Sequence, residues 1–156
     1  MSGVHVPPTL VLRGLAAFAY VDDVSVSVTN HPKWTDEDVI SYLDEITALG
    51  RRVSATAAIA DFRAAMFGPR ERRVLMDWMA RENISSQQRT CLLADSILLR
   101  GAVTAYAWMS GTEGGAFDPK EGYKACDWTT KTTRASAADV YHALMGCYRL
   151  LELEIP

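Results

Sequence analysis

The chain has 156 residues, 49% of them hydrophobic and 22% charged, which is the composition of one globular domain with its own core. Its 16 Lys and Arg against 19 Asp and Glu give a net charge of −3, so nucleic acid is not an expected partner, because a phosphate backbone selects a basic surface. No apolar run approaches the roughly 20 residues of a membrane span and no signal-type segment opens the chain, so we expect a cytoplasmic protein without a membrane partner.

An antiparallel hairpin is the first expected element. Residues 10–21 form an apolar strand, and Asp22 and Asp23 supply the turn that follows it. Residues 24–29 alternate Val with Ser and Thr. This alternation is typical of a strand with one buried face and one face in solvent.

A capped helix follows the hairpin. Pro32 ends the strand, because proline cannot donate to a β-ladder. Thr35 and Asp38 have the spacing of a capping box, so we expect a helix over residues 36–49. Gly50 stands where a left-handed residue ends such a helix.

The next segments alternate apolar strands with capped amphipathic helices. The expected elements are a strand at 53–62, a helix at 69–83, a strand at 87–95, a helix at 97–109, a loop at 111–115, a strand at 116–117 and a helix that ends at 128. Pro69 and Pro119 occupy first helical positions, and Ser96 and Asp118 occupy N-cap positions.

The last expected helix begins after Ser136 and runs to Leu151, and its apolar residues form two neighbouring seams. The first seam is Val140, Leu144, Cys147 and Leu151, and the second is Tyr141, Met145 and Tyr148. If the domain buries only one seam, the other is expected to meet a second copy in a homodimer. The alternative is that the chain itself buries both seams.

This order of elements predicts one α/β domain. Its sheet is mixed and mostly parallel, with an N-terminal antiparallel hairpin, helices packed on it and an extra C-terminal helix. The expected core spans about residues 15–128, and the extra helix about residues 136–152.

Two stretches, residues 73–79 and 89–108, resemble STAS-like domains, the family named for sulfate transporters and anti-sigma-factor antagonists. The similar features are an apolar strand ending in Asp95-Ser96, a helix opening at Arg100-Gly101, the short strand Phe117-Asp118 and a helix ending in Trp128. The resemblance, to small stand-alone bacterial members, covers about residues 24–128. It implies a non-enzymatic regulatory or scaffolding domain that binds another protein.

The phosphorylation site of the antagonists is missing from this chain. Antagonists that resemble each other in this way carry a phosphorylatable Ser between the central strand and the following helix. Residues 61–69 contain neither Ser nor Thr. We therefore expect no modification of this turn by kinases of the anti-sigma type.

Polar residues at the carboxyl ends of the expected strands are the candidate ligand-binding set, because ligands of parallel α/β sheets bind at that edge. They are Asp61, Arg63, Asp95, Ser96, Arg100 and Asp118. The alternative is a structural role, in which the Asp and Ser side chains cap helices. Arg100 opposes the helix dipole and is expected to pair with Asp95.

No catalytic set, metal site or cofactor motif is expected. No His or Lys close in sequence could activate Ser96, and no glycine-rich phosphate loop is present. Cys91, Cys126 and Cys147 are spaced too widely for a zinc site, and their apolar neighbours predict buried, reduced thiols.

The expected partner-binding residues are aromatic or sulfur-containing. They are Trp34, in a proline-containing loop, and the second seam of the last helix, Tyr141, Met145 and Tyr148. An alternative function is that of a sensor that holds a small molecule or lipid in an apolar pocket between the sheet and the helices.

Overall fold

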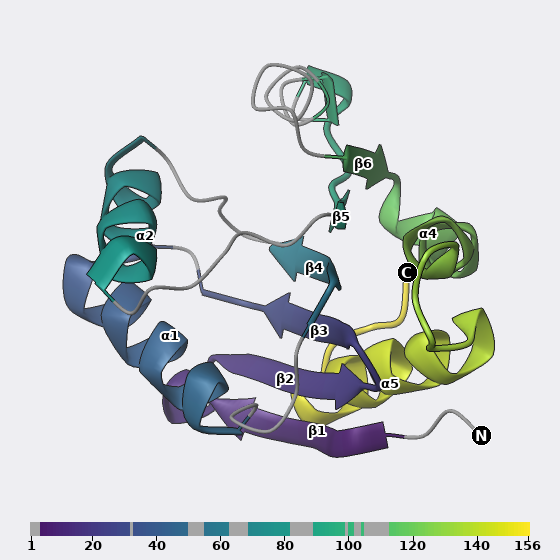
Figure 1. Ribbon diagram of the computed structural model, residues 1–156, viewed down its shortest axis with the longest axis horizontal. Coiled ribbons are helices and arrows are strands. Elements are labelled where there is room, and N and C mark those ends of the chain that lie inside the picture. Colours follow the sequence, from purple (N-terminus) through teal and green to yellow (C-terminus); the bar gives the residue numbers. More distant parts are fainter. Residues whose placement is uncertain are drawn as a thin grey trace.

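The fold has three layers, with helices on both faces of one six-stranded sheet (Figure 1). The computed structural model describes residues 4–31, 33–49, 55–62, 69–81, 89–98, 100–101, 104 and 113–156. The strands are β1 (Val4–Val11), β2 (Ala16–Val21), β3 (Val24–Thr29), β4 (Ala57–Phe62), β5 (Arg89–Leu93) and β6 (Glu113–Phe117). The helices are α1 (Asp36–Leu49), α2 (Pro69–Arg81), α4 (Gly122–Thr130) and α5 (Ala137–Leu150), with short 3₁₀ turns η1 (Leu12–Gly14) and η2 (Pro119–Glu121).

The predicted fold class is confirmed. The strands lie in chain order from β1 to β6, with antiparallel pairing from β1 to β3 and parallel pairing from β3 to β6. α1 and α2 lie on one side of this sheet, and α4 and α5 lie on the other (Figure 1). The hairpin across Asp22 and Asp23 and the helix over 36–49 are also confirmed, whereas Gly50 lies outside the described residues.

The first strand is an element that the sequence analysis missed. The expected strand over residues 10–21 is interrupted at η1, and the chain before it forms β1, which pairs with β2. Pro7 and Pro8 argue against a strand in the middle of a sheet, but β1 is an edge strand, where an N–H that points away from β2 has no ladder partner. Both prolines also lie in the stretch between Val6 and Thr9 where the register with β2 shifts.

The prediction that one face of β3 is in solvent was wrong, since all six of its residues are buried. Val24, Val26 and Val28 belong to the core between the sheet and α5. Ser25 and Ser27 point to the opposite face, where a second core lies between the sheet and α1. Alternation of Val with Ser and Thr shows that a strand has one apolar and one polar face. Whether a helix covers the polar face depends on the tertiary structure.

The expectation that α5 leaves one seam exposed was also wrong. Val140, Leu144 and Cys147 of the first seam are buried, and so are Met145 and Tyr148 of the second. The helix contacts β1, β2 and β3 and also packs beside α4, so two neighbouring elements cover its wide apolar arc. The alternative, in which the chain itself buries both seams, is the observed one for these residues.

The amino ends of η2, which precedes α4, and of α5 have the predicted caps. Asp118 accepts a hydrogen bond from Lys120 N at 2.9 Å, and the chain passes through η2 before α4 begins. Ser136 accepts from Asp139 N at 3.1 Å at the start of α5. The expected loop at 111–115 was wrong for residues 113–115, which extend β6 toward its amino end.

Gly146 is expected to tolerate no side chain. A Cβ there would lie 2.7 Å from Pro8 Cγ, because α5 crosses β1 at this point. Alanine improves helix propensity by up to about 1 kcal/mol, but overpacking a rigid neighbour costs about 1 to 3 kcal/mol. We expect Gly146→Ala to lower the melting temperature by a few degrees. The control is Gly101→Ala, where nothing lies within 4 Å, and an unchanged or raised melting temperature for both variants would contradict this packing.

Candidate functional site

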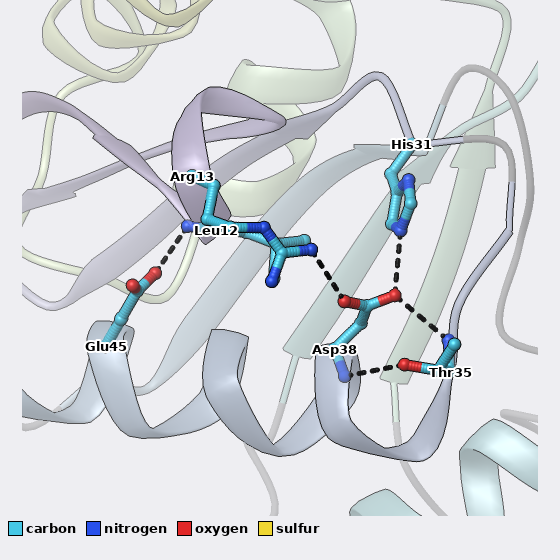
Figure 2. A network of polar contacts seen from close by, with 6 residues as sticks. All are labelled: Leu12, Arg13, His31, Thr35, Asp38 and Glu45. Carbon is cyan, nitrogen blue, oxygen red and sulfur yellow. Dashed lines mark hydrogen bonds and ion pairs between the residues drawn. The ribbon is translucent and has the colours of Figure 1, made fainter.

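A polar network joins the amino end of α1 to the carboxyl end of β3 and to the turn η1 (Figure 2). Asp38 stands at its centre, in the first turn of α1. One of its oxygens, Oδ2, lies 2.9 Å from His31 Nε2 and accepts from Thr35 N at 3.1 Å. The other oxygen accepts from the Arg13 guanidinium at 3.1 Å. One buried carboxylate therefore connects three separate segments.

The electrostatics of Asp38 follow from these contacts. The hydrogen bond from His31, followed by that from the Thr35 backbone, holds the pKa of this carboxyl far below its ordinary value. Thr35 Oγ1 in turn accepts from Asp38 N at 3.1 Å, which completes the capping box predicted for α1. The Asp38 side chain thus supplies the reciprocal bond of the capping box, to Thr35 N, and also contacts His31 and Arg13.

The turn that presents Arg13 has an unusual backbone. Leu12, Arg13 and Gly14 have φ values of 52°, 55° and 83°, and left-handed conformations of non-glycine residues cost about 1 to 3 kcal/mol each. The carboxylate of Glu45 accepts from the Leu12 N–H, so α1 supports this turn at two places (Figure 2). Arg13 remains 71% exposed at its side chain although it is held by Asp38.

His31 and Asp38 form a carboxylate-oriented imidazole, an arrangement that can also serve acid and base chemistry. The His31 ring packs edge to face against Trp34, with 5.4 Å between centroids. Within the described residues, no Ser, Thr or Cys side chain hydrogen-bonds to His31. The sequence predicts the capping box of Thr35 and Asp38, but no sequence spacing connects Arg13 to residues 31–38.

Asp61 lies on the opposite face of the sheet, deep in the α5 layer. Its side chain is 1% exposed and accepts a hydrogen bond from the Tyr148 hydroxyl of α5. Its register neighbours are Val28 on β3 and Leu93 on β5, both in the apolar core. This candidate ligand residue is therefore enclosed by the core and bonded to a residue that was expected to bind a partner.

The ion pair expected between Arg100 and Asp95 was wrong. Arg100 Nη1 lies 3.6 Å from Asp118 Oδ2 and donates to Ala94 O at 2.6 Å, whereas Asp95 and Ser96 are exposed. The pairing of β5 with β6 brings Asp118 beside the end of β5. Arg100 therefore links the ends of two strands.

The remaining candidates are only partly accessible. Trp34, one of the expected partner-binding residues, is buried: it is 7% exposed and packs against His31 and Tyr42. Tyr141 is half-buried beside Tyr123, with 5.4 Å between ring centroids. Arg63 and the turn it belongs to lie outside the described residues. Of the candidate ligand set, the described contacts bring together Arg100 and Asp118.

The three cysteines are expected to be unreactive in the folded protein. Burial raises the pKa of Cys91, Cys126 and Cys147 to about 12. At pH 8 such a thiol is ionised in about one molecule in ten thousand, and the thiolate is the reactive form. We expect a water-soluble thiol reagent to label none of them within minutes, and all three after unfolding in denaturant. A thiol that reacts at the denatured rate in the native protein would contradict this burial.

Across the described ranges, no group of three or more His, Cys, Asp or Glu side chains could hold a metal ion. In the same part of the chain, no helix has the length and apolar character needed to span a bilayer. No family model matches the chain, and neither the curated proteins nor the solved structures contain a match.

Proposed function

We propose that this chain is a non-enzymatic regulatory or scaffolding domain of the cytoplasm that acts by binding another protein, as its resemblance to STAS-like domains implies. The main supporting observation is a pair of consecutive aliphatic side chains, Ile97 and Leu98, which are 77% and 87% exposed. Burying a side chain of this kind stabilises a complex by about 1.5 to 3 kcal/mol. A protein partner that covers Ile97 and Leu98 would gain this free energy on binding.

The surroundings of Ile97 and Leu98 support a docking role. They follow Asp95 and Ser96 at the carboxyl end of β5, and both of these polar residues are exposed. At Gly101, one helical turn further on, nothing lies within 4 Å of the point that a Cβ would occupy, so a partner side chain could approach its backbone closely. An apolar pair bordered by polar side chains is the usual composition of an interface.

The polar candidates serve the fold, which supports a non-enzymatic role. Asp118 caps η2 and pairs with Arg100, and Asp38 completes the capping box of α1 by accepting from Thr35 N. Each therefore has a structural role that needs no substrate. A binding domain uses such residues to hold its shape.

The test compares the wild-type chain with Leu98→Glu as bait in a native cell extract, with retained proteins identified by mass spectrometry. Leu150→Glu is the matched control, since Leu150 is also exposed but lies at the end of α5. We expect one retained protein to be lost with Leu98→Glu and kept with Leu150→Glu. Retention of no protein other than the chain itself, or equal retention by both variants, would overturn the proposal.

A second candidate function is that of a small-molecule or lipid sensor. The supporting observation is a row of small residues, Ala58, Thr90 and Gly114, which are register partners on β4, β5 and β6. Thr90 is exposed and the other two are half-buried, although they lie on the face that points toward the α1 and α2 layer. Native mass spectrometry of the purified chain tests it, because a bound molecule of defined mass would favour a sensor and a clean apo mass would exclude it.

A homodimer through the C-terminal helix is the weaker form of the partner proposal. Of the second seam, Tyr141 keeps surface for a second copy, because Met145 and Tyr148 are buried. Tyr123 of α4 lies against Tyr141 and is 52% exposed. A Tyr123→Glu variant that leaves the mass measured by light scattering unchanged would exclude this interface.

A further inference from the structure

The two edges of the sheet differ in how they are protected. The β1 edge contains Pro7 and Pro8, and its register with β2 shifts between Val4 and Val6 and between Val6 and Thr9. Prolines and irregular register are the features that keep an edge strand from pairing with another chain. The β6 edge has neither, since Glu113–Phe117 contains no proline and pairs with β5 in continuous register.

The hydrogen-bonding groups of β6 that point away from β5 can be assigned from its pairing. Ala94 N donates to Phe117 O at 3.0 Å, so the backbone groups of Phe117 face β5. Because these groups alternate along a strand, those of Gly114 and Ala116 point away from β5. No strand in the described part of the chain pairs with β6 on that side.

We propose that a second copy of this chain pairs with this edge, antiparallel and centred on Gly115. In this register Gly114 of each copy lies opposite Ala116 of the other, so the outward N–H and C=O groups of both residues are paired. A centre at Gly114 or Ala116 would leave some of these groups opposite residues beyond β6. The centre at Gly115 also places the two Glu113 carboxylates at opposite ends of the paired strands, which avoids a like-charge contact.

The side chains beside Gly115 favour a second copy as the occupant. The far edge of the Trp128 ring lies over Gly115, at 2.9 Å from where a Cβ would be. Trp128 and Phe117 are both half-buried, with 6.0 Å between ring centroids. The two-fold axis beside Gly115 would bring the Trp128 rings of both copies together at the centre of the interface, where aromatic residues contribute most, while Phe117 of each copy lies near the end of the paired strands.

The Trp128 ring is already fixed in the position that this interface needs. The Arg89 guanidinium lies 4.0 Å from the ring centroid, and Arg89 Nε donates to Trp128 O at 3.0 Å. Arg89 also pairs with Glu113, so the first residue of β6 and the tryptophan share one cation. Little conformational freedom remains to be lost when a second copy binds.

The inference goes beyond the proposed function, because it requires no other protein.

Light scattering over a concentration series of the full chain tests the pairing. We expect the mass to rise from 17.2 kDa toward twice that value with concentration. Ala116→Pro removes one outward N–H and should stay at the monomer mass, since proline is tolerated on an edge strand. The matched control, Ala116→Thr, keeps the N–H and should dimerise like the wild type. A monomer at every concentration, or a dimer that persists in Ala116→Pro, would overturn the inference.

Amide hydrogen exchange keeps the inference testable if Ala116→Pro does not fold. In the wild type, the Gly114 and Ala116 amides should exchange at least tenfold more slowly at the concentration where the mass doubles than at high dilution. Exchange of both amides at one rate across the series would show that this edge stays open to solvent. Such a result would not affect the protein-binding proposal, because Ile97 and Leu98 follow the carboxyl end of β5 and are not part of β6.

Discussion

Replacing Asp38 by alanine is expected to lower the free energy of unfolding by about 2 to 4 kcal/mol. Loss of the capping-box hydrogen bond from Thr35 N costs about 1 kcal/mol, and loss of the charged partner of His31 costs about 1.5 to 3 kcal/mol. The contribution of Arg13 to this sum is small, since its side chain is 71% exposed and solvent screens the ion pair. Urea denaturation of the two proteins measures the difference. A loss below about 0.5 kcal/mol would show that the network in Figure 2 does not stabilise the fold.

The effect of Asp38 is also expected to depend on pH. The folded-state pKa of this carboxyl lies well below its unfolded value of about 3.9, so ionised Asp38 stabilises the folded protein above pH 4. That contribution decreases as the pH falls below 4 toward the folded-state pKa. The stability difference between wild type and Asp38→Asn should therefore be present at pH 5 and should shrink below pH 4. Asp95→Asn, at an exposed position, is the control with no expected change.

Tyr148→Phe is expected to lower the free energy of unfolding by about 1 to 3 kcal/mol. The variant keeps the ring volume but removes the hydroxyl that donates to Asp61, a carboxylate enclosed by the core. Leaving a buried acceptor without this donor costs the desolvation of the group. Tyr141→Phe on the same helix is the matched control, since Tyr141 is half-buried and a change there should stay within about 0.5 kcal/mol.

A double-mutant cycle separates the Asp61 and Tyr148 contact from general damage to the core. Asp61→Leu combined with Tyr148→Phe removes both polar partners and replaces them with apolar groups. We expect the double variant to lose less stability than the sum of the two single variants, with a coupling of about 1 to 3 kcal/mol. Additive losses would mean that the two side chains are buried independently.

Most elements could be predicted from the sequence, because their signals are local. Thr35 and Asp38 are three residues apart, and Ser136 and Asp139 have the same spacing, so a single turn of chain decides both caps. β1 could not be predicted, since the prolines that argue against a strand are harmful only in the interior of a sheet. Its position at the edge is set by pairing with β2.

The candidate site, unlike most of the strands and helices, could not be predicted from the sequence. The six candidate ligand residues share one property, a place at the carboxyl end of an expected strand, and this property does not determine which face of the sheet each side chain points to. Asp61 points into the α5 core, whereas Arg100 reaches Asp118 across the ends of β5 and β6. The Asp38 network could not be predicted because His31 lies 7 residues and Arg13 lies 25 residues before Asp38 in the chain, and no local pattern connects them.

The sequence by itself determined the fold class, most of the described strands and helices and the caps at Thr35, Asp118 and Ser136, because periodicity and capping act within one or two turns of chain. Only the tertiary structure decided what covers each face. The serine face of β3 is buried on the side of α1, most residues of both α5 seams are buried against the sheet and α4, and β1 and β6 are the edge strands of the sheet in the described part of the chain. Burial of a surface depends on which distant segment packs against it. The sequence of a strand or helix shows how polar its faces are, but it does not show which segment will cover each face.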